Sequence, residues 1–357
     1  MRLLKNNTVR ARAPLRLGLA GGGTDLSPYC DTFGGAVLNA TISRYAMVTI
    51  SHSLSGKAEF VCRDMGGETS ATLRELCAAD AVFESKFALS AAVYRHMLKE
   101  YIADFQQPLR IETSIDAAAG SGLGSSSALV VALVMAFVYA FDLPLGQYEI
   151  GELAWRIERV DLDLAGGKQD QYAAAFGGVN FIEFIANNRV VVNPLRLPSA
   201  ALLELDLSLL VAYTGVSRQS ENIIRDQVKS ASNSKSDALE ALHALKSDAY
   251  ELKAALLKWD VQEMGAVLNR SWLHKKQTSS LVSSNQIDEL YALALRLGAL
   301  GGKVSGAGGG GYMMFLVDPA KRNRIRFELR EAGADADFVS LTNDGAQAWL
   351  APRFDHM

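Results

Sequence analysis

The sequence predicts an α+β protein folded into two lobes. Three observations support this prediction. Residues 9–193 alternate strand-like and helical segments, residues 219–297 have an almost continuous helical periodicity, and residues 311–341 return to strand, helix and strand. No repeat of fixed period interrupts this order. We therefore expect a mixed first lobe, followed by a helix-rich second lobe that ends in a β-α-β unit.

Chain length and proline content predict where the two lobes divide. At 357 residues the chain exceeds one ordinary domain and is long enough to bury two cores. The segment Pro194–Ala201 contains two of the eight prolines. We expect the boundary there, with one lobe at residues 1–198 and the other at residues 199–357.

Composition excludes several classes of protein. The 36 Lys and Arg against 39 Asp and Glu give a net charge of -3, which does not favour a nucleic-acid binder. Cys30, Cys62 and Cys77 lack C-x-x-C spacing, and the five histidines form no metal motif, so a reducing cytosol is expected. The first residues show no signal peptide, and the apolar run Ala128–Phe141 is shorter than the roughly 18 residues of a membrane span. We expect a cytoplasmic protein that binds neither nucleic acid nor membrane; its oligomeric state is not predicted.

Periodicity and turn residues define the elements expected in the first lobe. Val9–Ala20 alternates basic and apolar residues before a glycine-rich loop, which is typical of a strand. Two further strands, Arg44–Ser51 and Lys57–Arg63, are expected to form a hairpin across Ser53–Gly56. The remaining expected elements are a helix at Lys86–Tyr101, a strand at Leu109–Ile115, helices from Ser125, at Gln147–Arg159 and near Gln169–Ala175, and a hairpin of Gly178–Phe184 and Arg189–Asn193 that turns at Ala186–Asn188.

The second lobe is expected to start with a strand at Leu207–Tyr213. Helices should fill Gln219–Leu297, with a break in the serine-rich interval Ser230–Ser236. The expected end is a strand at Gly311–Val317, a helix at Pro319–Ala332 and a strand at Ala336–Leu341.

Most of the 30 glycines lie in a few short windows, and one window predicts a phosphate site. Gly120–Ala128 reads Gly-Ser-Gly-Leu-Gly-Ser-Ser-Ser-Ala and leads into the long apolar helix. A helix N-terminus offers unpaired N–H groups and a positive dipole end, and the serines add donors and a potential Mg²⁺ ligand. A glycine-rich turn with serine N-caps is the alternative. No Walker A motif and no protein-kinase motif occurs in the chain.

A second window, Gly301–Gly311, contains G-x-G-x-x-G at Gly306, Gly308 and Gly311. A dinucleotide fold would require a helix after this pattern, but the following residues, Tyr312–Val317, indicate a strand. We therefore expect a bare loop that packs against another glycine-rich loop or against a phosphate.

A third window, Arg16–Asp25, ends the first strand in glycines followed by Thr24 and Asp25. A hydroxyl and a carboxylate at a loop tip suit the binding of sugar hydroxyls. The alternative is a solvated turn in which Asp25 caps the following residues.

Taken together and in this order, the three windows resemble the motifs of the GHMP kinases, the family of galactose, homoserine, mevalonate and phosphomevalonate kinases. Motif one is similar to Ala13–Asp25, motif two to Gly120–Ala128 and motif three to Lys303–Gly311. The resemblance implies a two-lobed fold with an N-terminal α/β lobe and a C-terminal ferredoxin-like lobe with added helices. It also implies that ATP binds between the lobes, at Gly120, Ser121, Gly122, Leu123, Gly124, Ser125, Ser126, Ser127, Gly308 and Gly309.

The resemblance further implies catalytic roles. Ser126 of motif two and Glu158 on a following helix would hold Mg²⁺. The catalytic aspartate of galactokinase-like members lies twelve residues beyond that glutamate, which is Asp170 here, and Arg16 occupies the position of its basic partner. A cation beside Asp170 would favour the ionised carboxylate.

Alternatives to these assignments stay open. Glu158 and Asp170 are the residue types that also form ordinary surface charges, and Asp161 and Asp163 compete with Glu158 as metal ligands.

The substrate implied by the resemblance is a sugar phosphate. Where galactokinases have Gly-Glu-His-Thr-Asp, this chain has Gly21-Gly22-Gly23-Thr24-Asp25, which makes galactose an unsuitable substrate. This version is similar to the subgroup that phosphorylates C1 of a manno-heptose 7-phosphate for the synthesis of GDP-activated heptose. Arg218 is the expected ligand of the substrate phosphate, with a surface helix cap as its alternative. The residues expected to contact the sugar are Gly22, Gly23, Thr24, Asp25 and Arg218. The alternative functions are an L-fucose or other sugar 1-kinase of the family, and a non-catalytic sensor of sugar and ATP.

Overall fold

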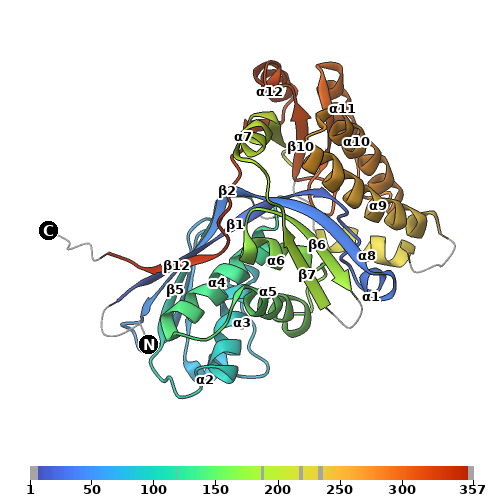
Figure 1. The fold of residues 1–357 in the computed structure, drawn as a ribbon. Coiled ribbons are helices and arrows are strands. Elements are labelled where there is room, and N and C mark those ends of the chain that lie inside the picture. Colours follow the sequence, from blue (N-terminus) through green and yellow to red (C-terminus); the bar gives the residue numbers. More distant parts are fainter. Residues whose placement is uncertain (1–6, 119, 186–188, 217–219, 232–235, 353–357) are drawn as a thin grey trace.

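The computed structural model describes residues 7–118, 120–185, 189–216, 220–231 and 236–352. Within these residues the chain forms an eight-stranded sheet and a four-stranded sheet (Figure 1). The two-lobed α+β fold expected from the sequence is confirmed.

The eight-stranded sheet is built around the long strands β1 (Val9–Ala20) and β2 (Gly35–His52). Its strand order is β12-β1-β2-β5-β3-β4, with β6 paired to β2 and β7 to β6. The other strands are β3 (Ala58–Cys62), β4 (Glu68–Ala71), β5 (Leu109–Ile115), β6 (Val179–Ile185), β7 (Arg189–Pro194) and β12 (Gln347–Leu350).

The hairpin predicted across Ser53–Gly56 is wrong. β2 pairs antiparallel with β5, and β3 pairs in parallel with β5 on its other edge. A short polar link allows a tight turn, but it does not prevent a distant strand from taking the edge of β2. β5 takes that edge because its inward residues Leu109 and Ile111 are fully buried in the core. The hairpin of β6 and β7 is confirmed, while its expected turn residues, 186–188, lie outside the described part of the chain.

One face of this sheet is covered by helices that lead to the cavity described below. α4 (Ser125–Phe141) is apolar on nearly all sides because it packs against β1 and β2 as well as against α5 and α6. Figure 1 shows α3–α6 on one side of β1 and β2, and α9 and α10 on the other. The helices on the first side are α3 (Ser85–Glu100), α5 (Gln147–Arg156) and α6 (Gln169–Phe176), with α2 (Leu73–Leu76) beyond them and α1 (Tyr29–Phe33) against β6.

The four-stranded sheet has the order β11-β8-β10-β9 and carries the second core. Its strands are β8 (Leu209–Tyr213), β9 (Ala299–Val304), β10 (Tyr312–Val317) and β11 (Asp335–Phe338). The helices of this half are α7 (Ser199–Ser208), α8 (Ser220–Ala231), α9 (Asp237–Lys258), α10 (Val261–Gln277), α11 (Asn285–Arg296) and α12 (Arg322–Glu331).

Two elements of this half differ from the prediction. α7 occupies Ser199–Ser208, where the sequence analysis placed only the boundary and the start of a strand. β9 is a strand although it contains Gly301 and Gly302, which predicted a loop. Gly301 is required because a Cβ there would lie 2.3 Å from the carbonyl oxygen of Gly265 on α10. Close packing of β9 on α10 therefore overrides the low strand propensity of glycine.

The end of the described chain returns to the first sheet, where β12 pairs with β1 from Val9 to Arg12. The division at residues 198 and 199 stays a proposal, in which β12 is the contribution of the second segment to the first lobe. No helix in the described ranges is long and apolar enough to cross a membrane.

Candidate active site

A cavity of about 270 Å³ lies where the glycine-rich loops of both halves meet. It is bounded by the loop after β1, the start of α4, the start of α6, and residues of α8 and α10. Of the residues singled out in the sequence, those that line it are Arg16, Gly23, Asp25, Gly120, Gly122, Gly124, Ser125, Ser126, Ser127, Glu158, Asp170 and Gly306.

Three consecutive residues at the start of α6 contact three different groups of the site. Successive side chains of an α-helix are rotated by about 100°, so neighbours in sequence face different directions. Gln169 donates to Asp25, Asp170 accepts from Arg16, and Gln171 donates to Glu158. This one helical turn therefore contacts Asp25 of motif one, Arg16 of β1 and the carboxylate of Glu158.

Asp170 is held by Arg16 and faces the cavity. Arg16 Nε and Nη2 both contact Asp170 Oδ1, at 2.7 and 2.6 Å. The guanidinium is 4% exposed and is fixed from behind by Nη1, which donates to the carbonyl oxygen of Gly122 at 2.6 Å. Within the described chain Asp170 Oδ2 has no hydrogen-bond donor, and the side chain is 21% exposed. This oxygen is available to accept a proton or a hydrogen bond from a bound molecule.

Glu158 and Ser126 form the second polar pair of the cavity. Ser126 Oγ donates to Glu158 Oε1 at 2.9 Å, while Gln171 Nε2 donates to both Glu158 Oε2 and Ser127 Oγ. Glu158 lies in η1 (Ile157–Asp161), a π-helical turn in which the N–H of Leu162 bonds the carbonyl of Ile157. The wider turn continues α5 and sets the direction of the carboxylate.

The competing ligands Asp161 and Asp163 lie elsewhere. Asp161 Oδ2 is 2.8 Å from His96 Nδ1, and neither aspartate lines the cavity. Among the described residues no group of three or more His, Cys, Asp or Glu could hold a metal ion. Ser126 and Glu158 bring a hydroxyl and a carboxylate to the cavity, and both are hard oxygens of the kind that Mg²⁺ prefers.

The glycines of motifs two and three let two backbones touch. A Cβ at Gly122 would lie 2.4 Å from the carbonyl oxygen of Ser305, and a Cβ at Gly306 would lie 2.9 Å from Gly122. Gly124, in a left-handed conformation, precedes α4 without a side-chain cap, so the serines of motif two are not N-caps. The expected packing of one bare loop on another is confirmed. Four expected ATP contacts lie outside the cavity lining in the described chain: Ser121, Leu123, Gly308 and Gly309.

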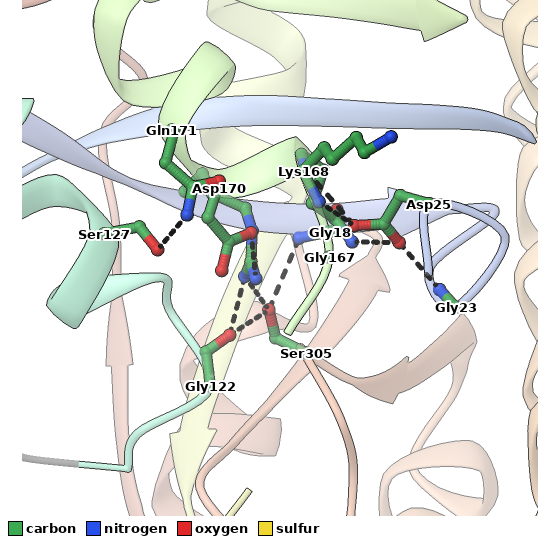
Figure 2. A network of polar contacts seen from close by, with 12 residues as sticks. Gly18, Gly23, Asp25, Gly122, Ser127, Gly167, Lys168, Asp170, Gln171 and Ser305 are labelled. Carbon is green, nitrogen blue, oxygen red and sulfur yellow. Dashed lines mark hydrogen bonds and ion pairs between the residues drawn. The ribbon is translucent and has the colours of Figure 1, made fainter. Parts of the chain in front are cut away.

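Two polar side chains of motif one, those of Thr24 and Asp25, are hydrogen-bonded to other groups of the protein. Thr24 is fully buried, and its hydroxyl donates to the carbonyls of Gly21 and Ala36. Asp25 accepts hydrogen bonds at both oxygens, from the backbone N–H groups of Gly23, Lys168 and Gln169 and from the Gln169 side chain (Figure 2). Asp25 therefore caps the start of α6. The sequence had suggested that it would cap the residues that directly follow it in the chain. The contacts of these residues with a sugar stay a prediction.

Two buried lysines that were not predicted as site residues donate to the backbone around motif one, and one of the two lines the cavity. Lys275 on α10 donates through Nζ to the carbonyl of Gly22 at 3.0 Å and lines the cavity. Lys303 on β9 donates to the carbonyl of Gly18 at 2.8 Å and does not line it. Burial lowers the pKa of Lys275 to about 8 and that of Lys303 to about 7.

A signal for Lys275 was present in the sequence. On α10 the buried residues Leu268, Ser271 and Trp272 define one face, and Lys275 follows at helical spacing. A lysine on the apolar face of an amphipathic helix indicates a special environment. Arg218, the residue expected to hold the substrate phosphate, lies outside the described part of the chain.

Figure 2 shows the Asp170 carboxylate between Ser127 on one side and Asp25 with Gly23 on the other. We call the first group, Ser125–Ser127 with Glu158 and Gln171, the motif-two side. The second group, Gly22–Asp25 with Gln169 and Lys275, is the motif-one side. The two sides meet at Asp170 and Arg16.

Comparison with known proteins finds two family models that match parts of the chain. Residues 88–178 match the model described as "GHMP kinases N terminal domain", and residues 252–335 match "GHMP kinases C terminal". The chain is 42% identical to the D-glycero-alpha-D-manno-heptose 7-phosphate kinase of Campylobacter jejuni, over 96% of this chain and 99% of that protein.

Two further similarities bear on the substrate. A crystal structure described as a D-glycero-D-manno-heptose 1-phosphate kinase from Bacteroides thetaiotaomicron superposes with a TM-score of 0.80 at 38% identity, over 97% of this chain and 100% of that one. The L-fucokinase/L-fucose-1-P guanylyltransferase of Bacteroides fragilis is 30% identical over 94% of this chain, which spans 37% of that protein.

Proposed function

The chain belongs to the GHMP kinase family, and on that premise we propose that it is an ATP- and Mg²⁺-dependent sugar kinase. Its proposed acceptor is the C1 hydroxyl of D-glycero-α-D-manno-heptose 7-phosphate, and its product is the 1,7-bisphosphate. The observation that carries the proposal is Asp170, with Oδ1 held by Arg16 and Oδ2 open to the cavity beside the start of α4.

The ATP phosphates are assigned to the motif-two side. Ser125, Ser126 and Ser127 form the first turn of α4, and Gly120, Gly122 and Gly124 line the cavity before it. The backbone N–H groups of such a turn, together with the helix dipole, favour phosphate oxygens. Gly124, the residue before this helix, has no side chain that could cap it.

Ser126 and Glu158 are the proposed holders of Mg²⁺. Their oxygens are 2.9 Å apart and both residues line the cavity, which fits an ion that prefers oxygen ligands. When bound, Mg²⁺ neutralises charge on the β- and γ-phosphates. Gln171 orients the carboxylate by donating to Glu158 Oε2.

The transfer step uses Asp170 at the acceptor hydroxyl. The C1 oxygen attacks the γ-phosphorus as the bond to the β–γ bridging oxygen breaks, and ADP leaves. The hydroxyl proton passes to Asp170 Oδ2, which the geometry leaves free. Arg16 keeps the carboxylate oriented and stabilises its ionised form until that transfer.

Support for the heptose substrate comes from the heptose kinase relative and from the Gly21–Asp25 sequence. The similarity to a fucokinase favours an L-fucose 1-kinase as the second candidate.

Phosphorus NMR of the product tests the proposal. The protein is incubated with ATP, Mg²⁺ and, in separate reactions, D-glycero-α-D-manno-heptose 7-phosphate, the unphosphorylated heptose, L-fucose and galactose. We expect a new phosphorus signal coupled to the anomeric proton, fastest with the heptose 7-phosphate. Faster turnover of free fucose would replace the substrate assignment, and ATP binding without any product would indicate a sensor.

A further inference from the structure

Lys275 is the one residue of the motif-one side that comes from the helices of the second half of the chain. Its amine crosses to the loop after β1 and donates to the Gly22 carbonyl at 3.0 Å. The residue is 3% exposed and lines the cavity. A buried amine at a cavity wall is costly unless a partner compensates its charge.

The described residues do not supply that partner. An ammonium group has three N–H donors, and Lys275 uses one of them, on a neutral carbonyl. No carboxylate of the described chain lies within 4.0 Å of it. Asp25 is the acidic residue whose charge acts on the Lys275 amine, but its two oxygens already accept four hydrogen bonds from Gly23, Lys168 and Gln169. An anionic group in the cavity would complete the site.

The position of Lys275 indicates which bound molecule would supply this anionic group. ATP phosphates belong to the motif-two side, and the reacting hydroxyl belongs at Asp170. Lys275 is bonded to Gly22, next to Gly23 and Asp25, which Figure 2 shows on the opposite side of Asp170 from Ser127. A group bound there belongs to the part of the acceptor that is distant from its reacting hydroxyl.

Gly23 leaves space for the amine of Lys275 because it has no side chain. A Cβ built on Gly23 would lie 3.1 Å from Lys275 Nζ, and Gly23 has a φ of 108°, which strains any side chain. In the galactokinase pattern this position is the histidine of Gly-Glu-His-Thr-Asp. A side chain there would occupy the space of the amine. The position of the Lys275 amine therefore depends on the lack of a side chain at Gly23.

We propose that Lys275 binds the phosphate of the sugar substrate and thereby selects a sugar phosphate over a free sugar. This inference rests on the proposed function, because it needs an acceptor that carries its own phosphate. The amine donates charge-assisted hydrogen bonds to the phosphate oxygens and keeps its bond to Gly22. The phosphate in turn supplies the negative charge that the buried amine lacks.

The test compares two acceptors on four proteins. KM and kcat are measured for heptose 7-phosphate and for the unphosphorylated heptose, with the wild type, Lys275→Met and Lys275→Arg. Lys303→Met is the matched control, because Lys303 is equally buried and bonds a motif-one carbonyl but does not line the cavity. We expect Lys275→Met to raise KM for heptose 7-phosphate by roughly 10- to 100-fold, with kcat and the KM of the free heptose changed less than about threefold. Lys275→Arg should fall between, and Lys303→Met should keep the discrimination of the wild type.

Several outcomes would overturn the inference. Equal losses for both sugars would make Lys275 a structural or transfer residue, and a raised KM for ATP alone would assign it to the nucleotide. Unchanged discrimination in Lys275→Met would remove it from substrate binding. Should Lys275→Met not fold, Lys275→Gln replaces it with the same expectations. If the proposed function itself is wrong, the wild-type protein will not turn over heptose 7-phosphate. That result is distinct from the outcomes above, which concern Lys275 alone.

Discussion

The two sides of the cavity differ in how far apart their residues lie in the chain. The motif-two side is assembled from residues 125–171 of one lobe, through contacts such as Ser126 to Glu158 and Gln171 to Ser127. The motif-one side needs Lys275, which is 253 positions from Gly22. The groups proposed to hold the ATP phosphates and Mg²⁺ are therefore close together in the sequence. Those proposed for acceptor choice depend on how the halves pack, so changes on the two sides should have separable effects.

The largest effect is expected at Asp170, where the two sides meet. Asp170→Asn keeps the size of the side chain and the contact with Arg16 but removes the proton acceptor. We expect kcat to fall roughly a thousandfold, with ATP binding retained. Steady-state kinetics and titration with ADP measure the two quantities. Activity within tenfold of wild type would show that Asp170 does not accept the proton.

A smaller but distinct loss is expected on the motif-two side. Glu158→Gln keeps the shape of the pair with Ser126 and removes the charge, so kcat/KM for ATP should fall about a hundredfold. The concentration of Mg²⁺ that gives half-maximal rate should rise with it. Asp161→Asn is the control, since Asp161 contacts His96 outside the cavity. If Asp161→Asn raised the Mg²⁺ requirement and Glu158→Gln did not, the metal ligand would have to be reassigned.

On the motif-one side, Asp25→Asn tests whether a capping carboxylate controls the transfer residue. The carboxylate accepts two hydrogen bonds at each oxygen, whereas an amide has one acceptor oxygen, so in either orientation its NH₂ group faces two N–H donors and the first turn of α6 should shift. We expect kcat to fall about tenfold and the free energy of unfolding to fall by about 1–3 kcal/mol. Asp206→Asn is the control, because Asp206 also bonds a backbone N–H, that of Leu341, away from the cavity. It should lose stability alone; equal loss of kcat in both variants would remove the special role of Asp25.

The smallest effect is on stability and concerns Lys303. Burial, then the nearby Lys275 and Arg16, lowers the pKa of Lys303 to about 7, whereas an unfolded lysine titrates near about 10.4. The unfolded state therefore binds more protons between about pH 7 and 10, and stability should rise with pH in that window. Below pH 7 both states are protonated and the full cost of the buried charge is present.

Lys303→Met should remove this cost and raise Tm by a few degrees at pH 6, with the gain shrinking toward pH 10. Thermal unfolding at both pH values measures it. Lys246→Met serves as control, because the Lys246 amine also donates to a carbonyl, that of Phe33, at a partly exposed position. A gain that does not depend on pH would show that charge burial is not its cause.

Sequence reasoning identified the local features and missed the long-range ones. The strand Val9–Ala20, the apolar helix from Ser125 and the start of α6 follow from periodicity and turn residues within each segment. The pairing of β5 with both β2 and β3 did not, because no local pattern states which distant strand takes an edge. β12 was missed for the same reason: its four residues gain their strand form only from β1.

The site residues likewise divide into those that local motifs predicted and those that depend on long-range contacts. Arg16, Ser126, Glu158 and Asp170 were found through motifs, and the structure brings all four to one cavity. The π-helical turn that holds Glu158 carries no clear sequence signature. Lys275 was overlooked because its importance depends on contact with a loop from the other half of the chain.

The return of β12 to β1 has a consequence for how the chain reaches its fold. Val9 pairs with Leu350, so the first strand of the described chain is completed by its last one. The stretch that leads to β12 also bonds the first lobe, where the N–H of Thr342 donates to the carbonyl of Thr41 and that of Ala346 to the carbonyl of Ala175 on α6. Closing so long a loop is entropically expensive and slows folding. Until residues 347–350 arrive, the outer edge of β1 is an open template for other chains, which makes a prematurely ended chain prone to aggregation.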